Sequence, residues 1–562
     1  ADLFAAAVSQ VGKLDMELHL DRFSVRPYGN YDRIAIQSLD RQTSRGVLQL
    51  VWDWFEAMTQ GEDFDIPSGI RQLQQSFRDS IYGSPSACAL WQAADCRGIP
   101  TFYLKEERLT QYGYGKYQVR GASTSFDCDS HLDSDFTTYK DACKDFLAAG
   151  GIPVPQGMVV SSLEGALAAA EEIGYPVAVK PVVGHKGIGV TANVRDERGL
   201  ESAFETAIEA IAGRNIDIIV EPHLEGADFR LLCAGGKFVA AVERRPPSVI
   251  GDGQSTIAEL IEQENATEAR LDTPTSPLGK IPIDEVLENY LDEQGLSLDS
   301  TIEAGQEVFL RKVANISAGG TTVDATRLIH PDNQILAQEI AQYFRLTCLG
   351  IDAIAKDISK SWKQGGFGII EINASPGIFM HFKPAVGESV DVPRRILEVL
   401  FPSGQPCRIP IVTFNRVSEP ELREMADRIL LQHPDWMVGA ICREAVLVNH
   451  SLQALNPDYN RAVQNLLRYP KLDLLIAEYP EEIFAAEGMA YEGSNLVVLK
   501  NPTETERVLA RDLLPNGTLI VKEGDQVSVK AKGLIEHYHL EACASFNHLY
   551  LQEVARLLAN CK

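Results

Sequence analysis

The stretch 369–377, which reads IIEINASPG, carries the strongest chemical signal of the chain. Glu371 and Asn373 stand two residues apart in an apolar run, so an extended strand would point both side chains to one face. Carboxylate and amide oxygens suit Mg²⁺, and a Mg²⁺ with few protein ligands keeps positions for substrate phosphates. Asp352, in the upstream segment LGID, is the candidate third ligand. Taken alone, 369–377 also fits a buried strand that ends in a turn.

Two lysines upstream could neutralise the phosphates of a nucleotide. Lys180 ends the predicted strand 176–181, and Lys140 lies in the predicted helix 138–150. Either lysine alone is more often a surface charge, so the prediction depends on their combination with the oxygen ligands.

The segment 184–189 reads GHKGIG and predicts a phosphate-binding loop. Its glycines, Gly187 among them, expose backbone N–H groups that can hold phosphate oxygens, and Lys186 adds positive charge. The G-K-[ST] ending of a P-loop is missing. A plain hairpin turn is the alternative.

A predicted apolar strand ends in Glu221, and Asp228 follows seven residues later. Glu221 could accept a hydrogen bond from the adenine amine, and Asp228 from the ribose hydroxyls. His223 lies where a hinge of the backbone would pass the adenine edge.

The segment 310–324 combines a fixed cation with a polar, glycine-containing loop. Arg311 could hold a carboxylate or a developing oxyanion with its planar guanidinium. The loop after it would bind substrate, with the two glycines offering N–H groups to the same charge; the candidate residues are Asn315, Ser317, Gly319 and Gly320.

Around these residues, strands and helices alternate between about 136 and 400, which favours a layered α/β region. Ser161 with Glu164 predicts a capping box for a helix that Gly174 ends. A third block has strand candidates at 408–414, 473–479, 495–500 and 518–523 and is typical of an open α/β sheet.

The order of lysines, glycine-rich loop, Glu–Asp hinge and Asp…Glu-x-Asn resembles the ATP-grasp family of carboxylate–amine ligases. Several stretches resemble, more narrowly, the cyanophycin synthetases, which build an Asp–Arg storage polymer. These stretches are ERRPPSVIGDGQSTIAELIEQEN (243–265), LRKVANISAGGTTVDAT (310–326), HPDN (330–333) and IIEINASPGIFMH (369–381). The resemblance is strong from about 90 to 400 and weaker on either side.

This resemblance implies a multidomain α/β and α+β chain with three parts. They are a polymer-binding domain at 1–135, an ATP-grasp domain at 136–400, and a truncated Mur-ligase-like domain at 401–562. In the family the last part needs a phosphate loop of the G-T-N-G-K-T type, whereas 415–420 reads NRVSEP. Without glycine the backbone cannot wrap closely around a triphosphate, so the third domain is predicted not to bind nucleotide.

The ATP-grasp domain is predicted to bind nucleotide and the third domain is predicted not to. This combination resembles the second type of cyanophycin synthetase, which polymerises ready-made β-Asp-Arg dipeptides. The resemblance implies ATP and Mg²⁺ as cofactors and an acyl phosphate on the polymer's C-terminal carboxylate, which the dipeptide amine attacks. Lys140, Lys180 and Lys186 would neutralise the phosphates, and Arg311 would stabilise the oxyanion. In the glycine-rich loop, Ile188 replaces the family's arginine, and Lys186 could compensate.

Two alternatives stay open. The chain could add free aspartate to the polymer while another protein supplies arginine, or it could be a non-catalytic relative that binds polymer. The expected partners are a cyanophycin primer and the dipeptide, and a homo-oligomer, first of all a dimer, is expected.

Composition limits the remaining possibilities. The 562 residues are 45% hydrophobic and 23% charged, and the net charge of −26 argues against a nucleic-acid partner. We see no apolar run that could span a bilayer and no secretory signal, so no membrane partner is expected. The ten cysteines form no C-x-x-C pair, which suggests a cytoplasmic, reducing location.

Overall fold

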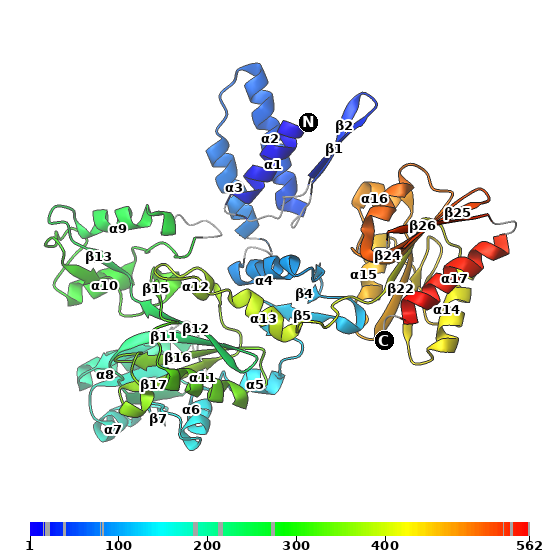
Figure 1. Cartoon of the computed structure of the whole chain (residues 1–562). Coiled ribbons are helices and arrows are strands. Elements are labelled where there is room, and N and C mark those ends of the chain that lie inside the picture. The colour runs from blue at the N-terminus through cyan, green and yellow to red at the C-terminus, as the bar shows by residue number, and fades with distance from the viewer. Residues whose placement is uncertain are drawn as a thin grey trace. The chain divides into compact units, whose positions relative to one another are not determined.

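The computed structural model describes residues 1–14, 16, 23–36, 41–78, 80, 84–183, 189–211, 217–270, 276–531, 533–539 and 543–559. The chain divides into two compact units, and Figure 1 labels their helices and strands. The first unit comprises Ala1–Ala93 and Ala122–Leu400, and the second comprises Ala94–Gly121 and Phe401–Lys562. Part of the expected N-terminal domain thus belongs with the C-terminal residues.

The first unit begins with helices. They are α1 (Asp2–Lys13), α2 (Arg41–Gln60), α3 (Ile66–Arg78) and α4 (Pro85–Cys96), with the hairpin β1 (Phe23–Tyr28) and β2 (Tyr31–Ile36) between α1 and α2. Helix α1 packs on α2 through Phe4, whose ring centroid lies 6.0 Å from that of Trp52 and 5.7 Å from that of Phe55.

A four-stranded antiparallel sheet follows, with the order β7-β10-β8-β9. The strands are β7 (Met158–Val160), β8 (Val177–Pro181), β9 (Thr191–Val194) and β10 (Ile218–Pro222). One face is apolar and packs on α7 (Leu163–Ile173) and α8 (Glu197–Ile211). Because side chains alternate along a strand, Lys180 and Glu221 point to the other face.

The helix α7 corrects one detail of the prediction. Ser162, not Ser161, caps its N-terminus, since the Ser162 hydroxyl accepts the Gly165 N–H at 3.1 Å. The C-terminal prediction is confirmed, because Gly174 follows the last turn with a φ of 85°.

The second sheet of this unit has five antiparallel strands in the order β15-β12-β11-β16-β17. They are β11 (Ala227–Ala234), β12 (Lys237–Arg245), β15 (Thr321–Asp324), β16 (Cys348–Ala355) and β17 (Phe367–Asn373). Leu231 and Ile351 belong to its apolar face, which packs on α6 (Lys140–Ala149) and α11 (Pro331–Tyr343). The residues that alternate with these apolar residues along each strand therefore point to the opposite face of the sheet.

Smaller elements complete the unit. The pair β13 (Ser248–Ile250) and β14 (Glu307–Phe309) packs with α9 (Ile257–Asn265) and α10 (Glu285–Glu293) around its own apolar core. The remaining helices are α5 (His131–Phe136), α12 (Phe379–Phe382) and α13 (Val392–Leu400), and the short 3-10 turn η3 spans Ile316–Ala318.

The second unit is built around a nine-stranded sheet, whose strand order is β21-β20-β19-β22-β18-β23-β24-β25-β26. Its central strands are parallel: β18 (Ile411–Phe414), β19 (Met437–Ile441), β22 (Leu472–Glu478), β23 (Ser494–Lys500) and β24 (Leu513–Glu523). The four predicted strands are therefore confirmed, and so is the open α/β sheet.

Edge strands and helices surround these central strands. The edge strands are β20 (Val446–Val448), β21 (Ser451–Gln453), β25 (Gln526–Ala531) and β26 (Leu534–His539). Residues from α14 (Glu419–Gln432) and α17 (Cys543–Ala559) form one core, and residues from α15 (Tyr459–Leu467) form the other. A short helix, α16 (Glu481–Glu487), follows β22.

The loop 111–115, QYGYG, is part of this second unit. It follows β3 (Thr101–Leu104) and β4 (Leu109–Tyr112) and continues into a 3-10 turn, η1 (Gly115–Tyr117), and β5 (Val119–Ala122). Gly113 has a φ of +78°, and a Cβ there would lie 2.9 Å from the carbonyl oxygen of Cys407. The glycine is thus required for close packing of this loop against Cys407 within the second unit.

No helix within the described ranges combines the length and the apolar character that crossing a bilayer would require.

Candidate active site

A row of polar side chains crosses one face of the five-stranded sheet. In the strand register, Arg244 of β12 lies opposite Asp228 of β11, Arg230 opposite Asp352 of β16, and Asp352 opposite Glu371 of β17. Cross-strand partners share a face, as do residues two apart on one strand. The sheet therefore brings together six residues: Asp228, Arg230, Arg244, Asp352, Glu371 and Asn373.

Asp352 is the most strongly held carboxylate of this row. Its side chain is 6% exposed and pairs with Arg230, and Arg244 Nη2 lies 3.2 Å from its Oδ2. Burial raises the pKa of Asp352, but the two guanidinium groups outweigh it and hold the pKa below its usual value. Asp352 is thus a fixed anion.

Asp228 shares Arg244 with Asp352, at 2.6 Å between Asp228 Oδ1 and Arg244 Nη2. Burial raises the pKa of Asp228, and the neighbouring charge of Asp352 raises it further against the effect of Arg244. The arginines therefore stabilise the ionised form of Asp352 more than that of Asp228. The assigned contact of Asp228 with a ribose stays a prediction.

The oxygen donors of this face fit a hard cation. Glu371 is 29% exposed, and the amide Nδ2 of Asn373 is buried without a hydrogen-bond partner among the described residues. The described residues hold no group of three His, Cys, Asp or Glu side chains that could bind a metal. The candidate Mg²⁺ set therefore needs the Asn373 amide oxygen beside Glu371, with Asp352 shared between metal and arginine.

Next to this row lies a cluster of three buried lysines, Lys140, Lys144 and Lys180, around the buried Glu221. Lys180 Nζ is 2.7 Å from Glu221 Oε1, and Lys144 pairs with Oε2 of the same carboxylate. Lys140 Nζ lies 3.9 Å from Glu371 Oε2, which links the cluster to the charged row.

The cluster has more positive than negative charge. Burial lowers the pKa of Lys140, and Lys180 lowers it further despite Glu371; burial and Lys180 likewise lower the pKa of Lys144. Burial would raise the pKa of Glu221, but Lys180 and Lys144 hold it below its usual value. A bound anion would stabilise the charged lysines.

The residues expected around the adenosine lie in different surroundings. Glu221 is already hydrogen-bonded to Lys144 and Lys180, so its expected contact with an adenine amine stays a prediction. His223 is partly exposed, and burial lowers the pKa of its imidazole. Lys186 and Gly187 lie outside the described residues.

Arg311 is buried outside the charged row. Its Nη2 lies 2.7 Å from Asp284 Oδ1 and donates to the Pro282 carbonyl at 3.0 Å, while its Nε is buried without a partner among the described residues. The loop that follows leads into β15, where Thr322 lies opposite Arg244. The segment therefore approaches the end of the row.

The expected oxyanion donors of this loop are engaged elsewhere. The Gly319 N–H donates to the Ile316 carbonyl, and the Gly320 N–H to the Asn315 carbonyl, both at 3.0 Å. In this conformation neither N–H is available to an oxyanion. Substrate binding by Asn315 and Ser317 stays a prediction.

Sequence reasoning did not assign roles to four residues of the site: Arg230, Arg244, Lys144 and His381. Arg230 follows Asp228 at the two-residue spacing of a strand, which was the available signal. His381, on α12, is fully buried, and both ring nitrogens lack partners among the described residues. Burial, with Arg230 and Arg244, lowers its pKa to about 3, so the imidazole is neutral.

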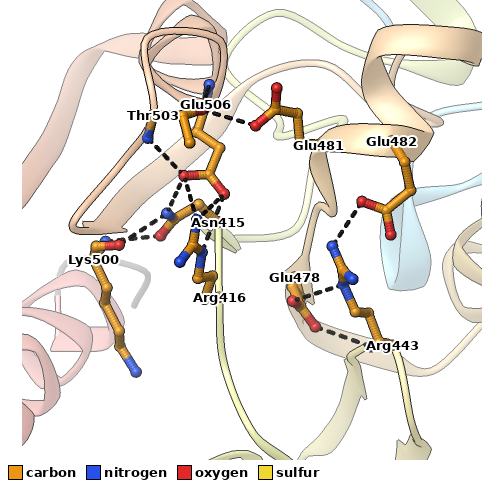
Figure 2. Close-up of polar contacts among 9 residues, drawn as sticks. All are labelled: Asn415, Arg416, Arg443, Glu478, Glu481, Glu482, Lys500, Thr503 and Glu506. Atoms are coloured by element: carbon orange, nitrogen blue, oxygen red, sulfur yellow. Dashed lines mark hydrogen bonds and ion pairs between the residues drawn. The ribbon is translucent and has the colours of Figure 1, made fainter.

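In the second unit, the loop after β18 differs from a phosphate loop. Figure 2 shows Asn415, Arg416 and Thr503 turned toward the buried carboxylate of Glu506. The side chain of Ser418 forms a capping box at the start of α14, which occupies part of that helix N-terminus. The groups that would face a triphosphate are thus bound within the protein.

Comparison with known proteins agrees with this geometry. Residues 134–225 match the model of the ATP-grasp domain family. A cyanophycin synthetase of Nostoc sp. is 30% identical over 511 residues, which is 87% of this chain and 56% of the relative. That of Synechocystis sp. is 33% identical over 439 residues, 78% of this chain and 50% of the relative. The chain therefore spans about half the length of the cyanophycin synthetases that it matches.

A crystal structure of a bifunctional glutathione synthetase from Pasteurella multocida is 25% identical, with a TM-score of 0.44, over 65% of this chain and 52% of that one. The predicted multidomain α/β architecture is confirmed, and so is the predicted resemblance to ATP-grasp proteins and cyanophycin synthetases; the resemblance to the second type stays a prediction. The chain contains an ATP-grasp domain and is similar, along most of its own length, to the cyanophycin synthetases.

Proposed function

We propose that this chain is an ATP-dependent ligase that adds β-Asp-Arg dipeptides to the C-terminus of cyanophycin. The observation that carries the proposal is the cluster of Lys140, Lys144 and Lys180 around one carboxylate, 3.9 Å from the candidate metal ligand Glu371. The similarity to proteins named cyanophycin synthetase supports the choice of substrate.

The lysine cluster suits the phosphates of ATP. Ammonium groups buried beside one another are costly unless anions compensate them, and Glu221 supplies only one negative charge. Phosphate oxygens would add the missing charge and counter the effect that lowers the pKa of Lys140 and Lys144. Lys140 is the lysine nearest to Glu371, so it would hold phosphate next to the metal ligands.

Mg²⁺ held by Glu371, Asn373 and Asp352 would neutralise phosphate charge beside these lysines. Arg230 and Arg244 have a positioning role, because they fix the Asp352 carboxylate on the face shared with Glu371. His381, whose pKa burial and the charges of Arg230 and Arg244 lower, is neutral and adds no charge to the site.

The proposed chemistry has two steps. An oxygen of the polymer's C-terminal carboxylate attacks the γ-phosphorus of ATP, and the bond to ADP breaks, which leaves an acyl phosphate. The dipeptide amine then attacks the acyl carbon, the carbon–oxygen bond to phosphate breaks, and the amine loses a proton. Lys140 and Lys180 would orient the phosphate oxygens during the first step, and Arg311 would hold the reacting carboxyl group.

The second unit favours a dipeptide over separate amino acids as the acceptor. Adding arginine in a separate step would need a second nucleotide site, and the loop 415–420 has neither glycine nor lysine. Its Asn415 and Arg416 are bound to Glu506. One working nucleotide site in the chain is sufficient if each added unit already contains arginine.

The test is ADP release with a cyanophycin primer and one acceptor at a time. We expect release with β-Asp-Arg and none with aspartate or arginine. Release with aspartate alone would favour stepwise addition, and no release with any acceptor would favour a polymer-binding protein.

Matched variants locate the reaction. Lys180→Ala should lower ADP release roughly 10²- to 10³-fold, as expected when one charge-stabilising donor is removed. Lys237→Ala, at an exposed lysine of β12, is the control. Equal rates for Lys180→Ala and wild type would rule out the assignment of the lysine cluster.

A separate variant tests Arg311. Arg311→Ala should nearly abolish turnover and leave ATP binding mostly intact, because the Arg311 guanidinium pairs with Asp284 and is not part of the lysine cluster proposed to bind the phosphates. Wild-type turnover in this variant would exclude Arg311 from the reaction.

A further inference from the structure

The second unit contains a cavity of about 840 Å³ at the carboxyl edge of its parallel strands. Arg416, Cys442, Glu478 and Lys500 line it, and each stands at or just beyond the end of β18, β19, β22 or β23. The chain runs from β18 to β19 and β22 on one side and then to β23 on the other. In open α/β sheets, ligands bind at such a switch point.

The charge of this cavity is negative. Three basic residues line it: Arg416, Arg443 and Lys500. Six glutamates oppose them: Glu421, Glu444, Glu478, Glu481, Glu482 and Glu506. A triphosphate would meet repulsion here, whereas a cation would be attracted.

The basic residues are already paired. Lys500 Nζ lies 2.6 Å from Glu421, and Arg416 Nη2 lies 3.1 Å from Glu506. Arg443 lies between two carboxylates, 2.7 Å from Glu482 and 3.7 Å from Glu478, as Figure 2 shows. Within the described ranges, Glu444 and Glu481 have no ion pair.

Glu478 is the most telling side chain of the cavity, because it is buried and incompletely bonded. It is 6% exposed, and its Oε2 accepts the Arg443 backbone N–H at 2.9 Å. Its Oε1 has only the Arg443 Nε at 3.7 Å, too far for a hydrogen bond. Burial raises the pKa of Glu478, and the charges of Glu482 and Glu444 add to this rise. A cationic donor placed in the cavity would supply a hydrogen bond to Glu478 Oε1.

We propose that this cavity binds a second guanidinium group, such as that of an arginine side chain, beside the guanidinium of Arg443 and among the carboxylates of Glu444, Glu478 and Glu482. A guanidinium presents five N–H donors in one plane and is weakly hydrated, so it can serve several separated carboxylates at a partly buried site. A metal ion fits less well, since no group of three acidic, His or Cys side chains among the described residues could hold one.

The binding of a guanidinium rests on this cavity alone, whereas its source rests on the proposed function. A β-Asp-Arg polymer carries one guanidinium per unit. The cavity would then be a second attachment point for the polymer on the chain, and free arginine would be the alternative source of the same group.

The experiment is calorimetric titration of the full chain with ethylguanidinium and, separately, with ethylammonium. We expect ethylguanidinium to bind more tightly, and the variant Glu478→Gln/Glu482→Gln to weaken it at least about tenfold, because each charge-assisted hydrogen bond is worth that much or more. Glu487→Gln, an exposed glutamate of α16 outside the cavity lining, is the matched control. A second variant, Glu444→Gln/Glu482→Gln, changes only exposed carboxylates and serves if the first fails to fold.

Two results would overturn the proposal: equal binding of ethylguanidinium to wild type and both double variants, or equal binding of the ammonium and guanidinium probes. Titration with arginine and with short cyanophycin chains then separates the two sources, since only attachment of the polymer predicts tighter binding of the chains. ADP release is measured in parallel. Guanidinium binding without ADP release would refute the ligase proposal and support the guanidinium site. ADP release together with guanidinium binding that the variants do not change would support the ligase proposal and refute the guanidinium site.

Discussion

Glu221→Gln removes the one carboxylate that holds Lys144 and Lys180 together. At 2.7 Å, the attraction between Lys180 and Glu221 amounts to about 6 kcal/mol at an effective dielectric constant of about 20. Desolvation of the pair offsets part of this, and the loss of one partner of a buried pair costs roughly 3–5 kcal/mol. Glutamine keeps the size and one acceptor, so the change reports on charge.

The loss should appear where the two strands meet. Hydrogen exchange of peptides covering 176–182 and 217–223 should become roughly a hundred- to a few thousand-fold faster in the variant, since about 1.4 kcal/mol corresponds to a factor of ten. Glu225→Gln is the control, because Glu225 forms an exposed ion pair with Lys356 and its loss should leave exchange in both peptides unchanged.

The difference should also depend on pH in a defined direction. Burial would raise the pKa of Glu221, but the lysines hold it below its ordinary value of 4.5. A carboxylate of this kind contributes stability above pH 4.5, and the contribution is lost as the pH falls through its folded-state pKa. Wild type and Glu221→Gln should therefore converge in acid. Equal exchange at pH 7, or a difference that persists in acid, would refute the reasoning.

Three further outcomes are expected. Asp352→Asn leaves two buried guanidinium groups without their shared carboxylate, so it should lower the free energy of unfolding by roughly 3–5 kcal/mol and abolish ADP release. Gly226→Ala should cost roughly 3 kcal/mol or more in urea unfolding, because its φ is +147° and a Cβ would lie 2.4 Å from a carbonyl of β16, whereas Gly174→Ala, which meets no atom within 4 Å, should cost about 1 kcal/mol. At pH 8 a thiol reagent should label the exposed Cys96 in the folded chain and Cys233 only after unfolding, because burial raises the pKa of Cys233 to about 12; labelling at equal rates would contradict this.

The sequence predicted those elements whose signals are local. The strand that ends in Lys180 and the helix that ends before Gly174 each have an apolar pattern and a terminator within a few residues. The capping residue was missed by one position, because Ser161 and Ser162 each have a polar or glycine residue three positions on. Strand β7 ends at Val160, and the geometry of the turn selects Ser162.

The pairing of side chains could not be predicted in the same way. Asp352 meets Arg230, 122 residues away, because β16 pairs with β11, and the register of that pairing is decided by the apolar face of the sheet. The residue types predicted a phosphate and metal site, and that assignment stays a prediction. They did not reveal that Glu221 lies between two lysines, nor that Arg244 is shared by two acids.

The route of the chain has a consequence for dissecting the protein. The backbone leaves the first unit after Ala93, returns at Ala122 and leaves again after Leu400, so a single cut at the last crossing would free neither unit. During synthesis, Phe102 and Tyr114 emerge long before the strands that they pack against, and the second unit stays incomplete until those strands follow. A deletion meant to remove the N-terminal helices should accordingly stop before α4. One that extends to residue 130 would remove Phe102 and Tyr114 from the core that they form with the C-terminal strands.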